Sequence, residues 1–351
     1  MFAIEDYYLI ERFINAPRGP FVWLGGFPTG AGFAAGPAFR YSRQTIIATA
    51  WSSVSTRRYW ELGGSLAFPM LASGNAYADL SVRRHEYPQE NFWGLGPTSN
   101  ESDETSFGFR ETVVAATAGV TPTWWLNASG SVAFLAPRAG SGRDRGEPSI
   151  EELFPDIAAF GRAEQPDYLR VGARAVVDTT ERPFGAPHGG IYSVSYDRYA
   201  DRGAGTSSFD QLEVDLRQYL PVFGSTRTLA LRAHYVSLLP DDDSDVPFYL
   251  LPTLGGPNSL RGLPSYRLRD RNLLLLQSEY RWEVNAFLRG VIFYEAGSVA
   301  RRPDDFRLSD FAQDYGAGLR IGFLTTVSLR IEAIFGADEG TVLMFRFGNV
   351  F

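Results

Sequence analysis

Apolar and polar residues alternate along most of this chain. The alternation is clearest in five segments, 75–87, 167–179, 271–285, 313–323 and 325–335. In the third of these, Leu274, Leu276 and Tyr280 fall on one face, and Gln277 and Glu279 fall on the other. A period of two residues is the signature of a β-strand, because successive side chains point to opposite faces. The chain is therefore predicted to be an all-β protein.

The lengths of the connections decide between two all-β architectures. Sixteen strands are predicted, at 20–27, 31–41, 44–54, 59–70, 75–87, 106–119, 123–135, 167–179, 189–200, 207–220, 226–238, 271–285, 287–297, 313–323, 325–335 and 341–351. Alternation alone fits a soluble sandwich with its polar face in water, or a membrane barrel with its apolar face in lipid. Short turns, however, alternate with longer loops, which is typical of outer-membrane barrels. We predict a transmembrane antiparallel barrel with both termini on the short-turn side.

The two terminal strands carry further signals. The last strand places Phe345, Phe347 and Phe351 on one face, which is well suited to a closing strand that meets lipid. The alternative is a buried C-terminal strand of a soluble sandwich. The first strand contains Gly25 and Gly26, which weaken strand pairing, so a poorly paired seam is expected between the first and last strands.

Composition narrows the classes of function. The chain has 351 residues, no Cys, three His and a net charge of −7. The sequence has no run of about 18 apolar residues, so no membrane-spanning helix is predicted. The negative charge argues against nucleic acid as a partner. Without Cys and with so few His, we predict no catalytic residues, no metal site and no cofactor.

Two regions are expected along the chain. Residues 19–351 are predicted to form the barrel. Residues 1–18 precede it as a periplasmic helix or a linker, because Leu9, Ile10, Phe13 and Ile14 have helical spacing.

The longest predicted loop holds the most specific motif. It reads LPTLGGPNSLRGLPSYRLRDRN over 251–272, and VIFYEAGSV follows at 291–299. Here the chain resembles the outer-membrane assembly superfamily of the BamA/TamA type, also called the bacterial surface antigen family. In that family the loop after the eleventh strand has a (V/I/L)RG(F/Y) tip, and the thirteenth strand has an F-x-D-x-G segment. The strand count places LRG in the loop after the eleventh predicted strand and FYEAG on the thirteenth, as in the family. The resemblance covers roughly 20–351.

The two motifs have a physical reason to meet. Gly255, Gly256 and Gly262 allow tight turns that fold the loop back into the barrel. Arg261 is then expected to lie over Phe293 and to pair with Glu295, which fixes the loop to the wall as a latch. The alternative is an Arg261 side chain in solvent.

The resemblance also has departures. Leu263 replaces the aromatic residue of the family's loop tip, and Glu295 replaces the usual Asp. The 18 residues ahead of the barrel are too few for a periplasmic POTRA repeat, so a compact member without POTRA domains is expected.

The resemblance implies a protein of the bacterial outer membrane that aids insertion or translocation of proteins. Its expected partners are outer-membrane lipid, lipopolysaccharide, and client or accessory envelope proteins. Two alternatives remain at this stage. One is a structural barrel that anchors a periplasmic or surface partner, and the other is a passive diffusion pore.

Overall fold

A computed structural model describes most of the chain after residue 17. The described ranges are 18–24, 27–28, 30–143, 146–158, 165–180, 188–203, 205–223, 226–242, 244–285, 287–324, 327–336 and 340–347. The predictions for residues 1–17, Gly25, Gly26 and Phe351 therefore fall outside the described residues, as does the side chain of Phe347. None of the helices in these ranges is long and apolar enough to cross a membrane.

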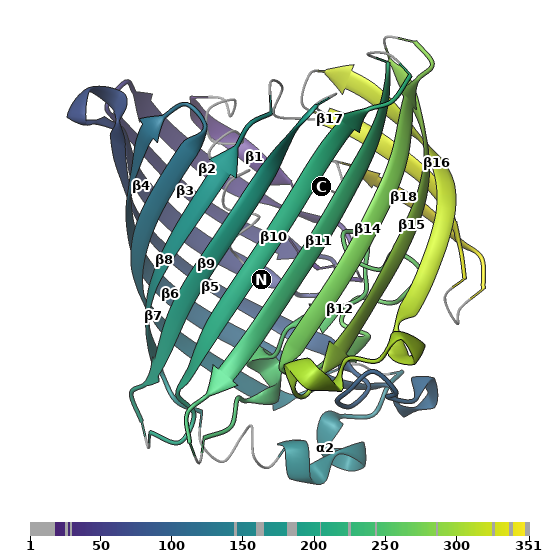
Figure 1. The fold of residues 1–351 in the computed structure, drawn as a ribbon. Coiled ribbons are helices and arrows are strands. Elements are labelled where there is room, and N and C mark those ends of the chain that lie inside the picture. The colour runs from purple at the N-terminus through teal and green to yellow at the C-terminus, as the bar shows by residue number, and fades with distance from the viewer. Residues whose placement is uncertain are drawn as a thin grey trace.

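Sixteen strands form one antiparallel sheet that curls into a barrel (Figure 1). They are β1 (Gly19–Leu24), β2 (Ala34–Arg43), β3 (Ile46–Ser55), β4 (Trp60–Leu71), β5 (Ala76–Phe92), β6 (Thr105–Thr123), β7 (Leu126–Ser141), β8 (Tyr168–Asp178), β9 (Gly189–Asp201), β10 (Phe209–Pro221), β11 (Arg227–Pro240), β14 (Asn272–Glu283), β15 (Leu288–Ala300), β16 (Ala312–Leu324), β17 (Val327–Phe335) and β18 (Val342–Phe347). Each pairs with its neighbour in the sequence, except that β11 pairs with β14. The predicted fold class and strand number are confirmed.

Short elements occupy the connections. A two-residue hairpin, β12 (Thr253–Leu254) and β13 (Leu268–Arg269), lies within the long connection between β11 and β14. One helical turn, α2 (Ile150–Leu153), follows β7, and 3₁₀ turns occur at Ala72–Gly74, Glu101–Asp103, Phe248–Leu250, Pro303–Asp305 and Leu308–Asp310. The long connections gather with α2 at the lower end of the barrel in Figure 1. The short turns lie at the opposite end.

The two edge strands of the sheet are β1 and β18, which are its shortest members as far as the structure describes them. β1 pairs with β2, and β18 pairs with β17, each over six residues. Within the ranges that the structure describes, β1 and β18 are not hydrogen-bonded to each other. In the described part of the chain, the sheet therefore has two edges where a closed barrel would have a continuous seam.

Two strands extend further toward the long loops than the sequence pattern predicts. β5 continues to Phe92 and β7 to Ser141, well past the predicted ends at 87 and 135. Phe92 and Phe107 are fully buried at this end of the wall, where they pack with the long loops. At this end the inward face is apolar because it packs with the long loops, whereas outward residues such as Arg110 and Arg138 are polar. The apolar-out, polar-in alternation therefore stops before the strands do, and the predicted strands ended too early.

The turn between β6 and β7 was also predicted at the wrong place. It lies at Trp124–Trp125 and not at Thr121–Pro122. Pro122 lies instead within β6, where the register with β7 shifts between Val120 and Thr123. A bulge tolerates proline because the missing N–H does not interrupt the ladder of hydrogen bonds.

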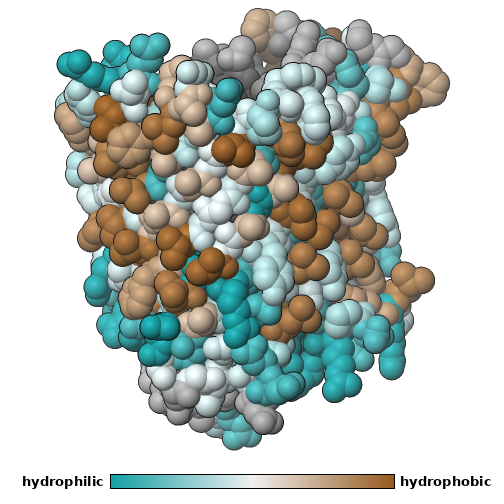
Figure 2. Space-filling view, turned by 60° about the vertical axis from the view of Figure 1, so that its left-hand side comes forward, coloured by the Kyte–Doolittle hydropathy of each residue, from teal (hydrophilic) through white to brown (hydrophobic). Residues whose placement is uncertain are grey.

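The two faces of the sheet differ in the sense expected for a barrel in lipid. Apolar side chains such as Leu80, Val114 and Phe134 point outward and are about half exposed. Charged side chains such as Glu279 and Arg330 point inward and are buried. Figure 2 shows hydrophobic side chains across the middle of one outer face, with hydrophilic ones gathered toward the lower end.

Candidate functional site: the interior loop

The connection between β11 and β14 folds into the barrel at residues 251–270, which we call the interior loop. Its hairpin pairs Thr253 with Arg269. Gly255 has φ +111°, and a Cβ there would lie 2.0 Å from the carbonyl oxygen of Pro264. The Gly256 N–H, at φ +99°, donates to the carbonyl of Leu263 at 2.9 Å. The tip therefore needs glycine at both positions.

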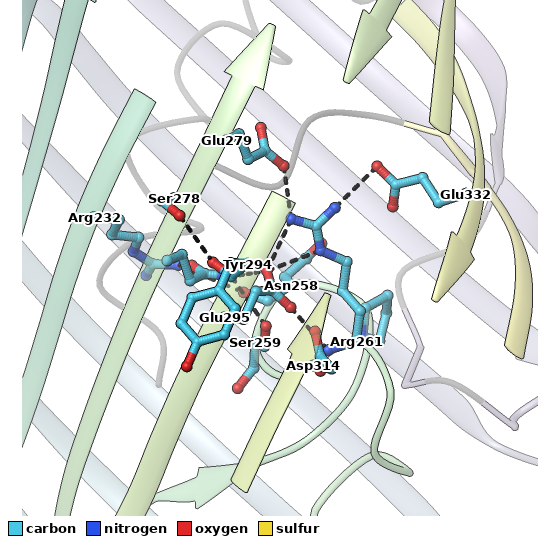
Figure 3. Close-up of polar contacts among 12 residues, drawn as sticks. Arg232, Asn258, Ser259, Arg261, Ser278, Glu279, Tyr294, Glu295, Asp314 and Glu332 are labelled. Carbon is cyan, nitrogen blue, oxygen red and sulfur yellow. Dashed lines mark hydrogen bonds and ion pairs between the residues drawn. The ribbon is translucent and has the colours of Figure 1, made fainter. Parts of the chain in front are cut away.

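Arg261 projects from this tip into a group of carboxylates on the barrel wall (Figure 3). Its Nε donates to Glu295 of β15 at 2.8 Å, its Nη2 to Glu279 of β14 at 2.6 Å, and its Nη1 to Glu332 of β17 at 3.0 Å. All four side chains are completely buried. One side chain of the loop thus contacts three strands.

Three further contacts hold the tip against β15 and β16. The Arg261 guanidinium lies over the ring of Phe293, 3.6 Å from the centroid. The backbone N–H of Arg261 donates to Glu295 at 3.1 Å, and that of Gly262 donates to Asp314 at 2.8 Å. The tip is therefore fixed by its backbone as well as by its side chain.

The charges at the tip compensate one another. Burial alone would lower the pKa of the Arg261 guanidinium, but Glu295, Glu279 and Glu332 more than offset this effect and raise the pKa above its usual value. Glu279 also accepts hydrogen bonds from Arg281 and Arg320, both at 2.7 Å. Removing one partner from such a cluster leaves an uncompensated buried charge, which is strongly destabilising.

The hydrogen-bonded network continues to the neighbouring strands. Gln277 of β14 donates to Glu295 at 2.5 Å and to the loop carbonyl of Ser259 at 2.9 Å. Its own carbonyl accepts from Arg232 of β11 at 3.1 Å, and Arg232 pairs with Asp215 of β10 at 2.8 Å. The loop tip is thereby linked to strands from β10 to β17.

A second attachment holds the outer part of the interior loop. Arg269 pairs with Glu90 of β5 at 2.6 Å, and its carbonyl accepts from the N–H of Gly96 at 2.9 Å. Arg267 donates to the carbonyl of Ser99 at 2.7 Å. Around these contacts lies a large apolar cluster under the long loops. It contains Leu254, Leu260 and Leu263 of the interior loop, together with Phe92 and Phe107 of the wall.

The structure brings together the residues that the loop motifs singled out. Arg261 contacts both Phe293 and Glu295, and the neighbouring Gly262 binds Asp314 through its backbone. Leu263 is buried although it lacks the aromatic ring of the family motif. Elsewhere, Phe345 of β18 points outward and is 60% exposed.

Three carboxylates of the site were not identified from the sequence as loop contacts. They are Glu279, Glu332 and Asp314. Glu279 and Glu332 fall on the polar faces of predicted strands, so the sequence did assign them to the lumen. The missing information was the cross-strand register, which pairs Glu295 with both Gln277 and Asp314.

The described residues contain no group of three or more His, Asp or Glu arranged to hold a metal ion. The site is instead a set of buried ion pairs between a loop and a wall. Such an arrangement can fix the position of the loop and can release it when one partner is lost.

Comparisons with known proteins agree with the fold. Residues 56–336 match the model of the Omp85 superfamily domain. BamA from Haemophilus ducreyi, solved without POTRA domains 1–3, has a similar structure, with a TM-score of 0.70 at 12% identity over 94% of this chain and 70% of that one. CdiB from Escherichia coli has a TM-score of 0.59 at 12% identity, over 93% of this chain and 59% of that one. CdiB from Acinetobacter baumannii has a TM-score of 0.57 at 12% identity, over 93% of this chain and 58% of that one. This chain thus spans under two thirds of the CdiB chains. A comparison with curated protein sequences found no match.

Proposed function

This chain belongs to the Omp85 superfamily, and from that premise we propose that it is an integral barrel of the bacterial outer membrane that aids the insertion or translocation of proteins. The outward apolar face supports a place in lipid, because side chains that alternate apolar-out and polar-in are characteristic of membrane barrels. The similarity to BamA and CdiB supports this class of function.

One observation carries the proposal, namely the two unpaired edges of the sheet in the described part of the chain. β1 and β18 have six residues each, and they are not paired with each other in the described ranges. An unpaired edge presents a row of N–H and C=O groups that can bind an incoming strand. In this mechanism a client strand pairs with one edge before it leaves into the membrane.

The interior loop has a supporting role in this proposal. Arg261 acts as the latch that keeps the loop inside the barrel, and the loop braces the wall from β10 to β17 next to the edge strand β18. The loop and the buried ion pairs fill part of the interior, which argues against a wide diffusion pore.

We further propose an orientation. The end with the long loops faces the cell surface and the short turns face the periplasm, as in other outer-membrane barrels. Both termini are at the short-turn end, because an even number of strands places them at the same end. Residues 19–351 form the membrane domain, and residues 1–18 lie on the periplasmic side.

Reconstitution tests this function. A urea-unfolded outer-membrane β-barrel protein is added to liposomes with and without the purified chain, and its folding is followed by its shift on a gel of unheated samples. We expect several-fold faster folding with the chain. No acceleration by a folded chain would argue for the structural alternative, and a large steady ion conductance would argue for the pore.

A further inference from the structure

Arginine side chains gather on the outward face of the barrel, close to the end with the long loops. Arg84 of β5 and Arg110 of β6 are exposed there. Arg138 of β7 and Arg143, just after β7, lie beside them, with side chains 36% and 74% exposed. We call these four residues the outer arginine cluster.

The strand registers show how closely the cluster is built. One row across the sheet reads Trp60, Glu86, Arg110 and Arg138, and each residue lies directly opposite the next. Arg84 lies in the adjacent row, opposite Leu62 and Thr112. Arg110 and Arg138 are thus direct cross-strand neighbours of the same charge, an arrangement that destabilises a sheet unless an anion lies between them.

The carboxylates nearby do not balance these charges. Asp167 pairs with Arg138 at 2.8 Å, and Glu86 lies 3.6 Å from Arg143. Among the residues that the structure describes, no ion pair involves Arg84 or Arg110. Four arginines against two carboxylates leave an excess of positive charge on a chain whose net charge is −7.

The height of the cluster along the barrel matches the edge of a membrane. The stretch of β6 from Arg110 to Thr123 spans about 34 Å of the barrel axis at about 3.4 Å per residue and a tilt of about 40°. The apolar band of a membrane barrel is only about 25 Å tall. Outward residues between these ends, such as Val114 and Val132, are apolar. If the turn at Trp124–Trp125 lies at one interface, Arg110 lies at the other.

We propose that the outer arginine cluster binds the phosphate groups of a lipid headgroup in the leaflet at the long-loop end. Guanidinium groups bind phosphate through paired hydrogen bonds. Arg84 and Arg110, which form no ion pair with any described residue and lie in adjacent rows near headgroup height, suit a lipid that carries phosphates on a sugar backbone, as lipid A does. The Trp60 ring in the same row suits the interface. This inference rests on the proposed place of the barrel in the outer membrane.

Binding is measured on the full chain in a non-ionic detergent by native mass spectrometry. The probes are lipid A with two phosphates, the same lipid after its phosphates are removed, and inorganic phosphate. We expect the R84Q/R110Q variant to bind phosphorylated lipid A about 30-fold more weakly than the unchanged chain. Lipid A without phosphates should bind both proteins equally weakly, and millimolar inorganic phosphate should not displace the lipid.

A matched control removes two exposed arginines from the loop after β15. The R302Q/R307Q variant loses the same charge and should bind lipid A like the unchanged chain. If R84Q/R110Q does not fold, the E86Q variant provides the opposite test, because it removes a competing carboxylate and should bind several-fold more tightly.

Equal affinity of R84Q/R110Q and the unchanged chain would overturn the proposal and leave the arginines as ordinary interfacial residues. Displacement of the lipid by inorganic phosphate would replace the lipid site with a free-anion site. Neither outcome depends on client folding, so failure here is distinct from failure of the proposed function.

Discussion

At the scale of single residues, the central feature is a guanidinium that contacts three buried carboxylates. A water-filled lumen would weaken such ion pairs. The side chains of Arg261, Glu279, Glu295 and Glu332 are instead completely buried. In a dry environment an unpaired charge is expensive, so the energetic effect of losing one partner should be large.

The first prediction concerns Arg261 itself. Arg261→Ala leaves three carboxylates without their shared partner, and we expect it to destabilise the barrel by about 3–5 kcal/mol. The measurement is the temperature at which the purified barrel unfolds in detergent, together with protease cleavage within the interior loop. Arg289→Ala is the control, because Arg289 and Glu283 form a pair whose side chains are about half exposed. Its effect should be below about 1 kcal/mol. Equal behaviour of the two variants would refute the latch.

The second prediction ranks two carboxylates. Glu279 accepts hydrogen bonds from Arg261, Arg281 and Arg320. Of these three arginines, Glu295 binds Arg261 alone. Glu279→Gln should therefore lower the unfolding temperature more than Glu295→Gln does, because it leaves more positive charge without a partner. The same thermal measurement in detergent decides the order. The reverse order would show that the backbone contacts of Glu295 dominate.

The limits of sequence reasoning are visible at this scale. The spacing of two motifs was enough to bring Arg261, Phe293 and Glu295 into one hypothesis. It was not enough to find Asp314, because its contact is with the backbone N–H of Gly262 and no side-chain pattern encodes that contact.

At the scale of elements, the shape of the interior loop depends on its glycine turn. Gly255 has a positive φ, and the carbonyl of Pro264 fills the space where a side chain would begin. Gly74, in the turn between β4 and β5, has a similar φ of +95° but nothing within 4 Å of its ideal Cβ. The two positions separate the cost of backbone conformation from the cost of a clash.

The third prediction uses this pair of glycines. Gly74→Ala should destabilise the barrel only by the cost of placing a residue with a Cβ in the left-handed backbone conformation, about 1–2 kcal/mol. Gly255→Ala adds a clash with backbone, so it should destabilise the barrel more and should also expose the interior loop to protease. Thermal unfolding and limited proteolysis of both variants provide the measurement. Similar losses for the two variants would mean that the tip can shift without cost.

The strands themselves were predictable where one face is apolar and the other polar. The pattern placed all sixteen, and it failed at the ends of β5, β6 and β7. At the ends of β5 and β7 near the long loops, inward residues such as Phe92 and Ala139 are apolar because they pack with the loops, so the apolar-out, polar-in alternation no longer holds. The turn at Trp124–Trp125 was missed because Pro122 is usually a turn residue, whereas here it occupies a bulge.

At the scale of the whole molecule, the proposed orientation can be tested with single cysteines, since the chain has none of its own. Leu308, in the connection after β15, is 87% exposed, and Phe223, in the turn after β10, is 82% exposed. They lie at opposite ends of the barrel.

The fourth prediction is that a membrane-impermeant maleimide labels Leu308→Cys on intact cells but labels Phe223→Cys only after the outer membrane is permeabilised. The labelled fraction on a gel is the readout. Labelling of Phe223→Cys alone on intact cells would show that the orientation is opposite to the one proposed. Clients would then approach the end with the long loops.

The proposed function requires that the edges of β1 and β18 separate. Val22 of β1 and Phe345 of β18 both point outward and are 65% and 60% exposed. A Val22→Cys/Phe345→Cys pair can lock the seam by oxidation in proteoliposomes. An Ala317→Cys/Ala333→Cys pair, which faces across the continuous ladder of β16 and β17, serves as the control.

The most direct test of the account is the rate of client folding in these proteoliposomes before and after oxidation. The account predicts that the oxidised seam pair loses the acceleration, that a reductant restores it, and that the oxidised control pair keeps it. Full acceleration by barrels whose seam is shown to be crosslinked would contradict the account, because clients would then be folding without the edge strands.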